Sequence, residues 1–317
     1  MKIVVLDGYA LNPGDLSWEN LEKLGECTIY DRTAPEDVLL RAKGAGAIIT
    51  NKVVISKSLM KSLPQLKYIG VTATGYNVVD VTAAKECDIV VTNIPAYSTE
   101  SVAQMVFSHI LNISSRVELH ANSVKDGNWE SNPDFAYWKT PQVELAGKTI
   151  GIVGFGRIGQ KVAGIARAFG MKVVFQNRSV KTNVPEGMVQ KSLAEVFSES
   201  DFVSLNCPMT PENTEFVNRS LIETMKPQAI LINTGRGGLV HEQDLANALN
   251  SGRIAAAGLD VLSTEPPIPG NPLLSARNCF ITPHIAWATF EARQRLMDLT
   301  VSNLNDFILG KPRNIVS

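Results

Sequence analysis

Short apolar runs recur along the chain, separated by stretches whose apolar residues follow helical spacing. Within the first 98 residues the runs lie at residues 3–6, 47–49, 68–71 and 89–91, and the helical stretches include residues 15–24 and 78–86. Strands that are apolar on both faces need cover on both sides, which is typical of a parallel sheet packed between helices. The first part of the chain therefore predicts one doubly wound α/β domain.

The alternation of apolar runs and helical stretches starts again after a long helical segment and an irregular one. Residues 98–124 have the spacing of one long helix, and residues 127–143, rich in Asn, Pro, Trp and Tyr, follow no period and indicate an irregular arm. Six further strands are predicted at residues 149–153, 172–175, 202–205, 229–232, 255–259 and 280–281. Six strands with intervening helices indicate a second, complete doubly wound sheet.

The last predicted helix, residues 289–309, has no strand after it. The first domain needs cover on one side, so we expect this helix to return to it. The predicted first domain is therefore discontinuous, with residues 1–98 and 286–317, and the second domain comprises residues 99–285. A chain of 317 residues is long enough for two such domains.

Composition excludes several classes of function. Lys and Arg total 30 against 31 for Asp and Glu, and the net charge of -1 argues against binding to nucleic acid or to an anionic membrane. The amino terminus lacks the apolar stretch of a signal peptide, and no apolar run approaches the roughly 18 residues that span a bilayer. The four cysteines form no C-x-x-C pair, which argues against a metal site and favours a reducing compartment. We expect a cytoplasmic protein with a small-molecule ligand.

A glycine pattern of the form G-x-G-x-x-G directly follows the strand predicted at residues 149–153. It comprises Gly154, Phe155, Gly156, Arg157, Ile158 and Gly159, and a helix is predicted at residues 160–169. The first glycine permits a tight turn, the second lets backbone amides approach a pyrophosphate, and the third lets the helix pack closely on the strand. The positive end of the helix favours the same anion. The pattern indicates dinucleotide binding, with an ordinary strand-to-helix turn as the alternative.

The end of the next strand bears on which dinucleotide binds. An acidic residue that bonds the adenosine ribose is usual there, but the sequence continues with Asn177, Arg178 and Ser179. Asn177 offers a hydrogen bond to a ribose hydroxyl without repelling a phosphate, and Arg178 and Ser179 offer donors to a 2′-phosphate. We therefore expect NADP in preference to NAD. The alternative is that Arg178 is a solvated surface residue.

Four ionisable residues follow predicted strands of the second domain. Arg236 follows the strand at residues 229–232, Asp260 and then Glu265 follow the next strand, and His284 follows the last. Ligands of open α/β sheets bind at the carboxyl ends of the strands, so these side chains are candidates for one shared site. Each alone is equally well explained as a structural ion pair or a capped loop, and their combination is the stronger indication.

Together these motifs resemble those of the D-isomer-specific 2-hydroxyacid dehydrogenases, over nearly the whole chain. The matching segments are G-F-G-R-I-G, N-T-G-R-G, G-L-D-V followed by E-P-P, and P-H-I-A-W. Two segments, V-T-A-T-G-Y-N and H-I-A-W-A, are most similar to the glycerate dehydrogenase and hydroxypyruvate reductase branch. The resemblance implies a flavodoxin-like substrate domain, a Rossmann cofactor domain, and a homodimer paired through the cofactor domain. The long helix from Ser98 and the arm around Trp129 and Trp138 are the candidate interface.

Carried over to this sequence, the family pattern assigns catalytic roles. It makes His284 the general acid and base, Glu265 its carboxylate partner, and Arg236 the residue that holds the substrate's carboxylate and carbonyl oxygen. Adding a hydride to a ketone builds negative charge on oxygen, which requires a nearby cation and an acid. Glu265 is expected to favour the imidazolium form of His284, so that reduction proceeds near neutral pH and oxidation prefers alkaline pH. Besides the glycine motif and residues 177–179, the implied cofactor contacts are Cys207, Pro208, Thr234, Gly235, Arg236 and Asp260, the last on the nicotinamide side.

The resemblance also implies substrate contacts. It places the substrate carboxylate on the backbone of Ala73, Thr74 and Gly75, a glycine turn that offers unobstructed amide donors. Asn51 is a candidate polar contact, equally well explained as exposed loop, and Trp287 is a candidate pocket wall, equally well explained as a core residue. No basic cluster suits a phosphorylated substrate. We therefore expect a short 2-keto acid, with hydroxypyruvate reduced to D-glycerate or glyoxylate reduced to glycolate.

Other functions stay open at this point. Within the family, D-lactate-type and phosphoglycerate-type dehydrogenases are alternatives, and formate dehydrogenases differ in having Gln in the place of Glu265. Outside enzymes, the alternative is a dinucleotide-sensing transcriptional co-repressor, because such proteins are similar to this family. We interpret the other histidines, His109, His120 and His241, as structural. The expected protein is an NAD(P)-dependent dehydrogenase that acts on CH–OH groups.

Overall fold

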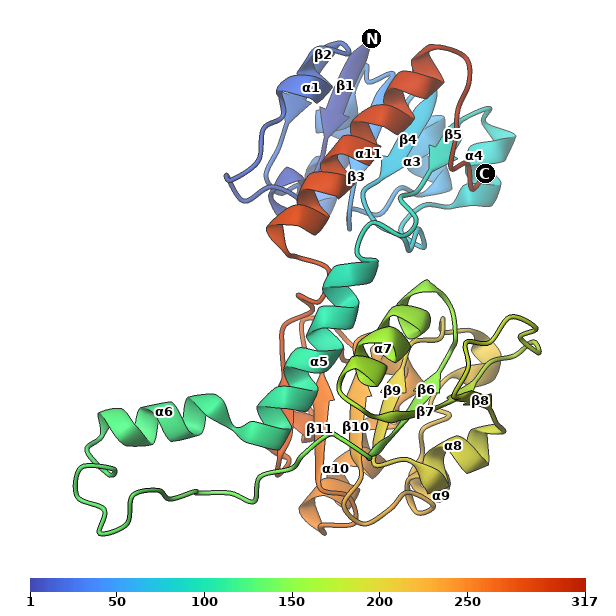
Figure 1. The fold of residues 1–317 in the computed structure, drawn as a ribbon. Helices are drawn as coiled ribbons and strands as arrows, with labels where there is room; N and C mark the ends of the chain where they lie inside the picture. The colour runs from blue at the N-terminus through green and yellow to red at the C-terminus, as the bar shows by residue number, and fades with distance from the viewer. The chain divides into compact units, whose positions relative to one another are not determined.

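The structure is a computed structural model that describes residues 1–317, and the chain divides into two compact units. The first unit comprises Met1–Ser98 and Ala288–Ser317, and the second comprises Thr99–Trp287. The second unit therefore ends at residue 287, where the sequence predicted residue 285. Each unit contains one sheet whose strands all run parallel (Figure 1), which confirms the predicted fold class. None of the helices is both long enough and apolar enough to traverse a bilayer.

The first unit is built on a five-stranded sheet with the order β2-β1-β3-β4-β5. Its strands are β1 (Lys2–Val5), β2 (Glu26–Ile29), β3 (Ala47–Thr50), β4 (Tyr68–Val71) and β5 (Val90–Thr92). Its helices are α1 (Glu19–Glu22), α2 (Val38–Ala42), α3 (Lys57–Lys61), α4 (Val81–Glu86) and α11 (Phe290–Ile308). Successive side chains of a strand point to opposite faces. Ile3 and Val5 accordingly pack with Leu304 of α11, whereas Val4 packs with Val38 of α2.

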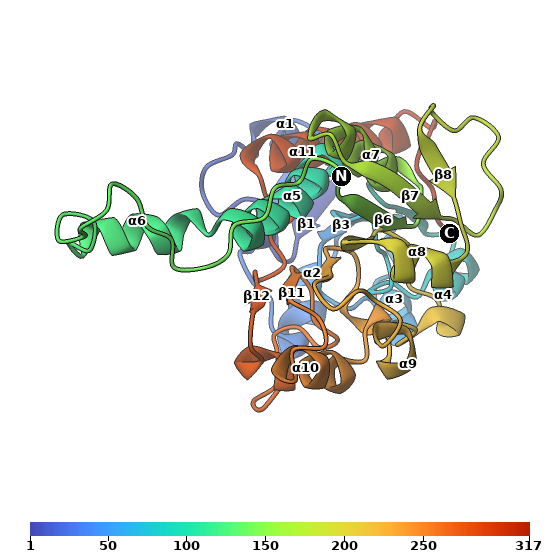
Figure 2. The same ribbon diagram turned by 60° about the horizontal axis from the view of Figure 1, so that its bottom comes forward.

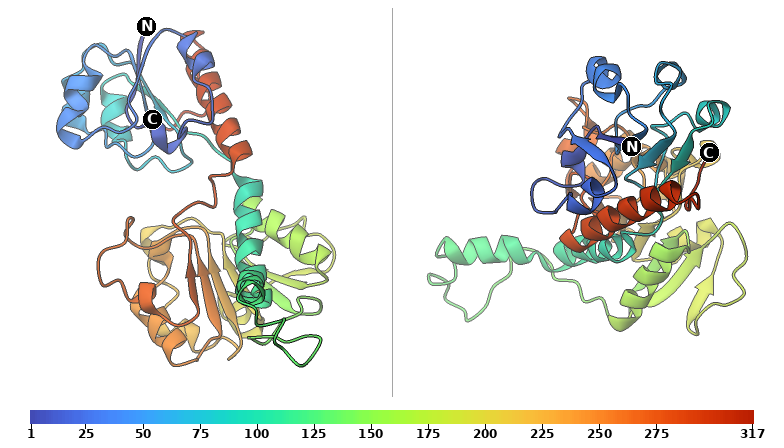
Figure 3. Two further views of the ribbon diagram at one scale, coloured as in Figure 1. Left: turned by 90° about the vertical axis from the view of Figure 1, so that its left-hand side faces the viewer. Right: turned by 90° about the horizontal axis from the view of Figure 1, so that it is seen from above.

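Helix α11 belongs to the first unit although the whole second unit precedes it in the sequence. It lies along one face of the sheet (Figure 3), where Phe307 packs on Tyr68 of β4 with ring centroids 4.9 Å apart. Near its start, the guanidinium of Arg293 donates to both carboxylate oxygens of Asp15 at 2.6 Å. This bidentate ion pair fixes α11 to the loop that precedes α1.

The second unit is built on a seven-stranded sheet with the order β12-β11-β10-β9-β6-β7-β8. Its strands are β6 (Thr149–Val153), β7 (Lys172–Gln176), β8 (Met188–Gln190), β9 (Phe202–Leu205), β10 (Ile230–Asn233), β11 (Ala256–Leu259) and β12 (Cys279–Ile281). Its helices are α5 (Thr99–Ser115), α6 (Val117–Lys125), α7 (Arg157–Ala168), α8 (Leu193–Glu199), α9 (Arg219–Ile222) and α10 (Glu242–Asn250). Helices α5 and α7 cover one face, and α8, α9 and α10 cover the other (Figure 2). The direction of winding reverses between β6 and β9, and such a reversal is where doubly wound sheets bind ligands.

The single helix expected over residues 98–124 is in fact two helices, α5 and α6. Arg116 separates them with a φ of 50°, in the left-handed region that ends an α-helix. Its guanidinium lies 4.4 Å from the centre of the Phe280 ring, a cation–π contact that stabilises the break. The arm, residues 127–143, contains no helix or strand, as expected.

Each sheet has one strand that the sequence does not predict, β2 in the first unit and β8 in the second. Helix α1 is also shorter than expected, because it covers Glu19–Glu22 rather than residues 15–24. The segment before it is held instead by Asn12, whose side chain accepts from the amides of Gly14 and Leu16. Such an Asx-type turn competes with the first turn of a helix.

Candidate active site

Three neighbouring strands of the second unit bring the ionisable residues to one edge of its sheet. Strands β10, β11 and β12 are consecutive in the sheet and parallel. Arg236 follows β10, Asp260 and Glu265 follow β11, and His284 follows β12. All four residues therefore lie beyond the carboxyl ends of the strands, where open α/β sheets bind their ligands.

His284 and Glu265 form a hydrogen-bonded pair at this edge. Nδ1 of His284 lies 2.5 Å from Oε2 of Glu265, and Oε1 of Glu265 accepts from the amide of Leu262 at 3.1 Å. The carboxylate is thus fixed by its own loop. Because a carboxylate oxygen only accepts hydrogen bonds, Nδ1 of His284 must carry a proton, and Nε2 is left to face a substrate. Both side chains are about one-third exposed, at 32% and 34%. The pair is accessible from solvent and has the geometry of a positioned acid.

The turn that carries Arg236 packs directly on the loop of Glu265. Asn233, the last residue of β10, donates to the carbonyl of Arg236 at 2.9 Å and accepts from the amide of Gly235 at 3.1 Å. A Cβ at Gly237 would overlap the carbonyl of Leu262, the residue whose amide holds Glu265. Arg236 itself is exposed and donates to the Gly235 carbonyl at 2.8 Å. Its charge is therefore available beside the His284–Glu265 loop.

Asp260 is buried, and both of its carboxylate oxygens bind protein donors; its contact on the nicotinamide side stays a prediction. It is 1% exposed, and Oδ1 accepts from the Thr282 hydroxyl at 2.5 Å and from the amide of Ile285 at 2.9 Å. Oδ2 accepts from the amide of Ala286 at 2.7 Å. Both oxygens thus bind the segment that carries His284. The geometry makes Asp260 the anchor of this loop.

The glycine motif has the shape that a pyrophosphate requires. Gly154 has a φ of 94°, and a Cβ there would lie 2.6 Å from the amide nitrogen of Cys207. A Cβ at Gly159 would overlap the carbonyl oxygen of Gly154, so the start of α7 packs closely on the end of β6. Gly156 is the N-cap of α7, has no capping side chain, and faces open space. The amides of the first turn of α7 are therefore free to bind an anion, which fits a dinucleotide.

Two buried polar atoms near the same edge lack partners. Oγ1 of Thr234, a residue that is 7% exposed, and Oδ1 of Asn206 make no hydrogen bond in the protein. Asn206 and Thr234 follow β9 and β10, and the paired residues just before them, Leu205 and Asn233, are in register. Buried polar groups without partners are rare, and a bound ligand commonly satisfies them. The residues present therefore fit a dinucleotide, and Cys207 and Pro208 adjoin the same strand end.

The loop expected to choose between NAD and NADP is held by its own side chains. Oδ1 of Asn177 accepts from the amide of Phe155 at 3.2 Å, and its Nδ2 donates to the carbonyl and hydroxyl of Ser179 at 2.9 and 3.1 Å. Gln190 of β8 donates to the carbonyls of Asn177 and Ser179. Asn177 therefore links the loop to the glycine motif instead of projecting toward solvent. Arg178 is exposed at the centre of this loop.

In the first unit, Ala73, Thr74 and Gly75 form a loop after β4. The Thr74 hydroxyl donates to the Ile94 carbonyl at 2.9 Å, and Asn93 donates to the Thr74 carbonyl at 2.8 Å. The backbone N–H groups of Thr74 and Gly75 donate to no acceptor of this unit. The loop thus presents amide donors that have no acceptor within this unit, and their contact with a substrate stays a prediction.

Asn51 does not project toward solvent. It is 7% exposed, and its Nδ2 donates to the carbonyl of Thr72 at 2.7 Å. Its own backbone amide donates to the Asp7 carboxylate at 2.8 Å. Asn51 thus ties the end of β3 to Thr72, the residue before the Ala73–Gly75 loop. Its contact with the substrate stays a prediction.

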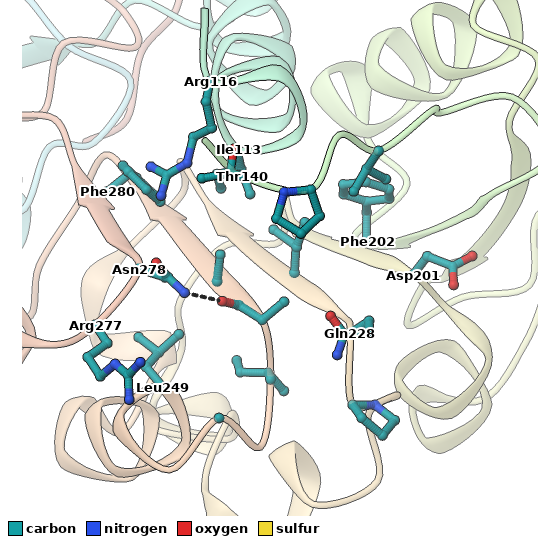
Figure 4. Close-up of a pocket in the computed structure, with 18 of the residues that line it drawn as sticks. Ile113, Arg116, Thr140, Asp201, Phe202, Gln228, Leu249, Arg277, Asn278 and Phe280 are labelled. Carbon is teal, nitrogen blue, oxygen red and sulfur yellow. Dashed lines mark hydrogen bonds between the residues drawn. The ribbon is translucent and has the colours of Figure 1, made fainter. Parts of the chain in front are cut away.

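The cavity drawn in Figure 4 is not this site. Its volume is about 550 Å³, and its lining includes Phe202, Ile230 and Ala256, the first residues of their strands, together with Phe280 of β12 and Asn278 just before that strand. Arg116 extends toward Phe280 along one wall, and Asn278 donates to the carbonyl of Ala255 at 3.0 Å. The cavity therefore opens at the edge of the sheet opposite to His284.

Comparison with known proteins identifies the family. The family described as D-isomer specific 2-hydroxyacid dehydrogenase, NAD binding domain, matches residues 107–286. That span contains the glycine motif, Arg236, Glu265 and His284. The chain belongs to this family. It is therefore an oxidoreductase that acts on CH–OH groups with a nicotinamide cofactor.

Relatives of this 2-hydroxyacid dehydrogenase span its whole length. A hydroxypyruvate reductase of Blautia hydrogenotrophica is 50% identical over 100% of both chains, and a glycerate dehydrogenase of Methylorubrum extorquens is 39% identical over 99% of this chain and 98% of its own. The structure of an NADPH-dependent glyoxylate/hydroxypyruvate reductase of Sinorhizobium meliloti, in complex with citrate, matches with a TM-score of 0.85 at 30% identity. That match covers 100% of this chain and 97% of the other. The glycerate dehydrogenase and hydroxypyruvate reductase branch is thereby confirmed.

Some residues that shape the dehydrogenase site were missed in the sequence. Asn233 orders the Arg236 turn, Thr282 binds Asp260, and Ser101 of α5 donates to the Ala286 carbonyl at 2.5 Å. Asn233 gave a usable signal, because it is a polar residue that closes an apolar strand just before a glycine turn. Ser101 gave none, since it is one of many polar residues on a long helix. Trp287, the last residue of the second unit, is half-buried and lies three positions after His284.

Proposed function

We propose that this dehydrogenase reduces short 2-keto acids, converting hydroxypyruvate to D-glycerate and glyoxylate to glycolate. The observation that carries the proposal is the His284–Glu265 pair at 2.5 Å, packed beside the turn of Arg236. The hydroxypyruvate reductase and glycerate dehydrogenase relatives support the choice of substrate. The sequence shows no basic cluster that would suit a phosphorylated acid.

The proposed chemistry assigns a task to each residue. The nicotinamide cofactor supplies the hydride when it is bound. As the keto carbon gains this hydride, the electron pair of the C=O double bond moves to oxygen, and the Arg236 guanidinium stabilises the developing charge. Nε2–H of His284 donates the proton that completes the hydroxyl group, while Glu265 holds the ring through Nδ1. In the oxidative direction His284 accepts the same proton.

The substrate's carboxylate is proposed to bind the free amides of Thr74 and Gly75. Backbone N–H groups in a glycine turn form a concave donor site for an anion, and no side chain obstructs Gly75. Support comes from the absence of any acceptor for these amides within the first unit. Trp287 is proposed to limit the size of the group attached to the keto carbon.

Replacement of the proposed acid tests the function. We expect His284→Gln to lower kcat for hydroxypyruvate reduction by about 10²-fold or more, because general acid catalysis contributes on that order. Binding of the reduced nicotinamide, followed by its fluorescence, should be unchanged. The matched control is His120→Gln, since His120 bonds only the backbone of Arg116 and Lys139 and should leave turnover intact. Retention of most of the turnover by His284→Gln contradicts the proposed function.

We further propose that NADPH is the preferred cofactor. Arg178 stands exposed on a loop fixed by Asn177 and Gln190, and no carboxylate ends β7. A guanidinium there is suited to a 2′-phosphate. The Sinorhizobium relative is named an NADPH-dependent reductase, which supports the same preference here.

Steady-state kinetics with both cofactors test this preference. Arg178→Ala should raise KM for NADPH by about tenfold, the order of one charge-assisted hydrogen bond. KM for NADH should change little, because NADH lacks the phosphate. A wild-type enzyme that uses NADH more efficiently than NADPH would overturn the assignment.

The protein is also proposed to act as a homodimer in the cytoplasm. The arm exposes large aromatic side chains, with Phe135 at 92% and Trp138 at 71% exposure, beside α6 with Val117 at 69%. Apolar side chains gathered on one segment favour a partner that covers them, and a second copy of the chain is the expected one.

The state of the cysteines supports the cytoplasmic location. All four cysteines are free, as in a reducing compartment, and burial raises the pKa of Cys279 to about 12.

A further inference from the structure

The buried histidine of α5 lies against the strand that ends in Asp260. His109 is 4% exposed, and a Cβ at Gly258 of β11 would lie 2.7 Å from the Cβ of His109. A glycine is therefore required at residue 258 for the ring to reach its position. From there Nε2 of His109 lies 3.3 Å from the hydroxyl oxygen of Thr282.

The direction of each hydrogen bond in this group follows from the number of protons. The Thr282 hydroxyl has one proton and lies 2.5 Å from Oδ1 of Asp260, an atom that only accepts. The hydroxyl therefore donates to Asp260 and accepts from Nε2–H of His109. Burial lowers the pKa of His109, which favours the neutral ring. The hydrogen bond to the Thr282 oxygen then assigns the single ring proton to Nε2.

The Asp260 carboxylate in turn fixes the backbone that carries His284. It accepts from the amides of Ile285 and Ala286, the two residues after His284, at 2.9 and 2.7 Å. His284 itself has a φ of 54°, a left-handed conformation that non-glycine residues seldom adopt. Such a conformation persists only where surrounding contacts determine it. The series of hydrogen bonds from His109 through Thr282 to Asp260 supplies part of those contacts.

We propose that His109 is a positioning residue for the reaction, acting through Thr282 and Asp260 to hold the His284 loop in its catalytic conformation. The inference rests on the proposed function in one respect, namely that His284 is the acid. His109 does not touch the substrate. Its hydrogen bond orients the Thr282 hydroxyl, which binds Oδ1 of Asp260 together with the amide of Ile285. Removal of the donor leaves the loop free to adopt other conformations.

A pair of substitutions at residue 109 separates positioning from packing. His109→Leu removes the donor, and His109→Gln keeps an N–H donor at nearly the place of Nε2. We expect His109→Leu to lower kcat for hydroxypyruvate reduction by about tenfold while KM stays within about twofold, because only the arrangement of the acid changes. His109→Gln should recover most of that loss. Equal losses of kcat in the two variants, in proportion to their losses of thermal stability, would show packing alone and overturn the proposal.

A double-mutant cycle with Thr282→Val provides the second measurement. This nearly isosteric change removes the hydroxyl. If His109→Leu does not fold, His109→Phe, which also lacks a donor, replaces it in the cycle. If His109 acts through Thr282, Thr282→Val lowers kcat by about as much as His109→Leu, and the kcat of the double variant is scarcely lower than that of either single variant. If the two losses of kcat multiply in the double variant, His109 and Thr282 act independently, and the proposal is refuted. A normal kcat in His109→Leu combined with an inactive His284→Gln refutes this inference and leaves the proposed function intact.

Discussion

At the scale of single residues, Asp260 shows how a buried charge is accommodated beside a reactive centre. Its carboxylate has no cation as a partner, and three protein donors, two of them backbone amides, bind its oxygens instead. Such donors satisfy a buried carboxylate while they fix the backbone that supplies them. The sequence located Asp260 at the end of a strand, but its partners lie 22 to 26 positions away, beyond the reach of pattern reasoning.

Burial of His109 predicts how the free energy of unfolding depends on pH. Burial lowers its pKa below the ordinary value of 6.5, and the smaller, opposite effect of Asp260 does not cancel this. Below pH 6.5 the unfolded chain therefore takes up a proton that the folded chain excludes, so the free energy of unfolding falls as the pH falls. The loss is at most about 1.4 kcal/mol per pH unit for one proton.

Urea denaturation at pH 7.5 and 5.5 measures this effect. Wild type should lose more stability between the two pH values than His109→Gln, which has no ionisable group at that position. The stability that the histidine provides is fully present above its unfolded-state pKa and is lost below it. Parallel losses in the two proteins would show that His109 does not titrate on unfolding.

At the scale of elements, the Arg236 turn depends on a close approach between two backbones. Gly237→Ala places a methyl group against the carbonyl of Leu262, which must move together with the Glu265 loop. We expect a loss of about 1–3 kcal/mol in stability and of about 10²-fold in kcat, because a shift of about 1 Å misplaces the catalytic groups.

The matched control is Gly164→Ala. Gly164 lies within α7, is exposed, and has nothing within 4 Å of an added Cβ. Alanine there should raise stability by about 0.5–1 kcal/mol and leave kcat unchanged, since it favours the helix. Thermal unfolding with parallel kinetics shows whether the two glycines have these opposite effects, and similar behaviour at both sites would contradict the interpretation of Gly237.

Most elements could be predicted from the sequence, and the exceptions share a physical cause. The central strands are apolar on both faces, so their runs stand out, as in the fully buried β3 and β10. The missed strands β2 and β8 are edge strands with no buried residue, and each lacks an apolar run. The break at Arg116 was missed because the apolar spacing continues across it, and its cation–π partner, Phe280, is distant in the sequence.

At the scale of the whole molecule, the exposed aromatic side chains of the arm predict self-association. Replacement of Phe135 and Trp138 together by Asp should convert a dimer to a monomer, because charged groups resist burial in an apolar interface. Light scattering during size-exclusion chromatography measures the mass. Leu40→Asp, at a residue of α2 that is 74% exposed, is the control that should remain dimeric. A wild-type chain that elutes as a monomer at micromolar concentration contradicts the prediction.

The return of α11 to the first unit has a consequence for biosynthesis. One face of the amino-terminal sheet, with Ile3, Val5 and Tyr68, is covered by a helix that begins at residue 290. On the ribosome, that face emerges early and stays exposed to solvent until nearly the entire polypeptide has been translated. The contiguous span 99–287, by contrast, carries all of its own strands and helices and is free to fold in the meantime. The second unit can thus complete its fold before the first unit does. Throughout that interval, the uncovered amino-terminal face is where a holding chaperone would be needed.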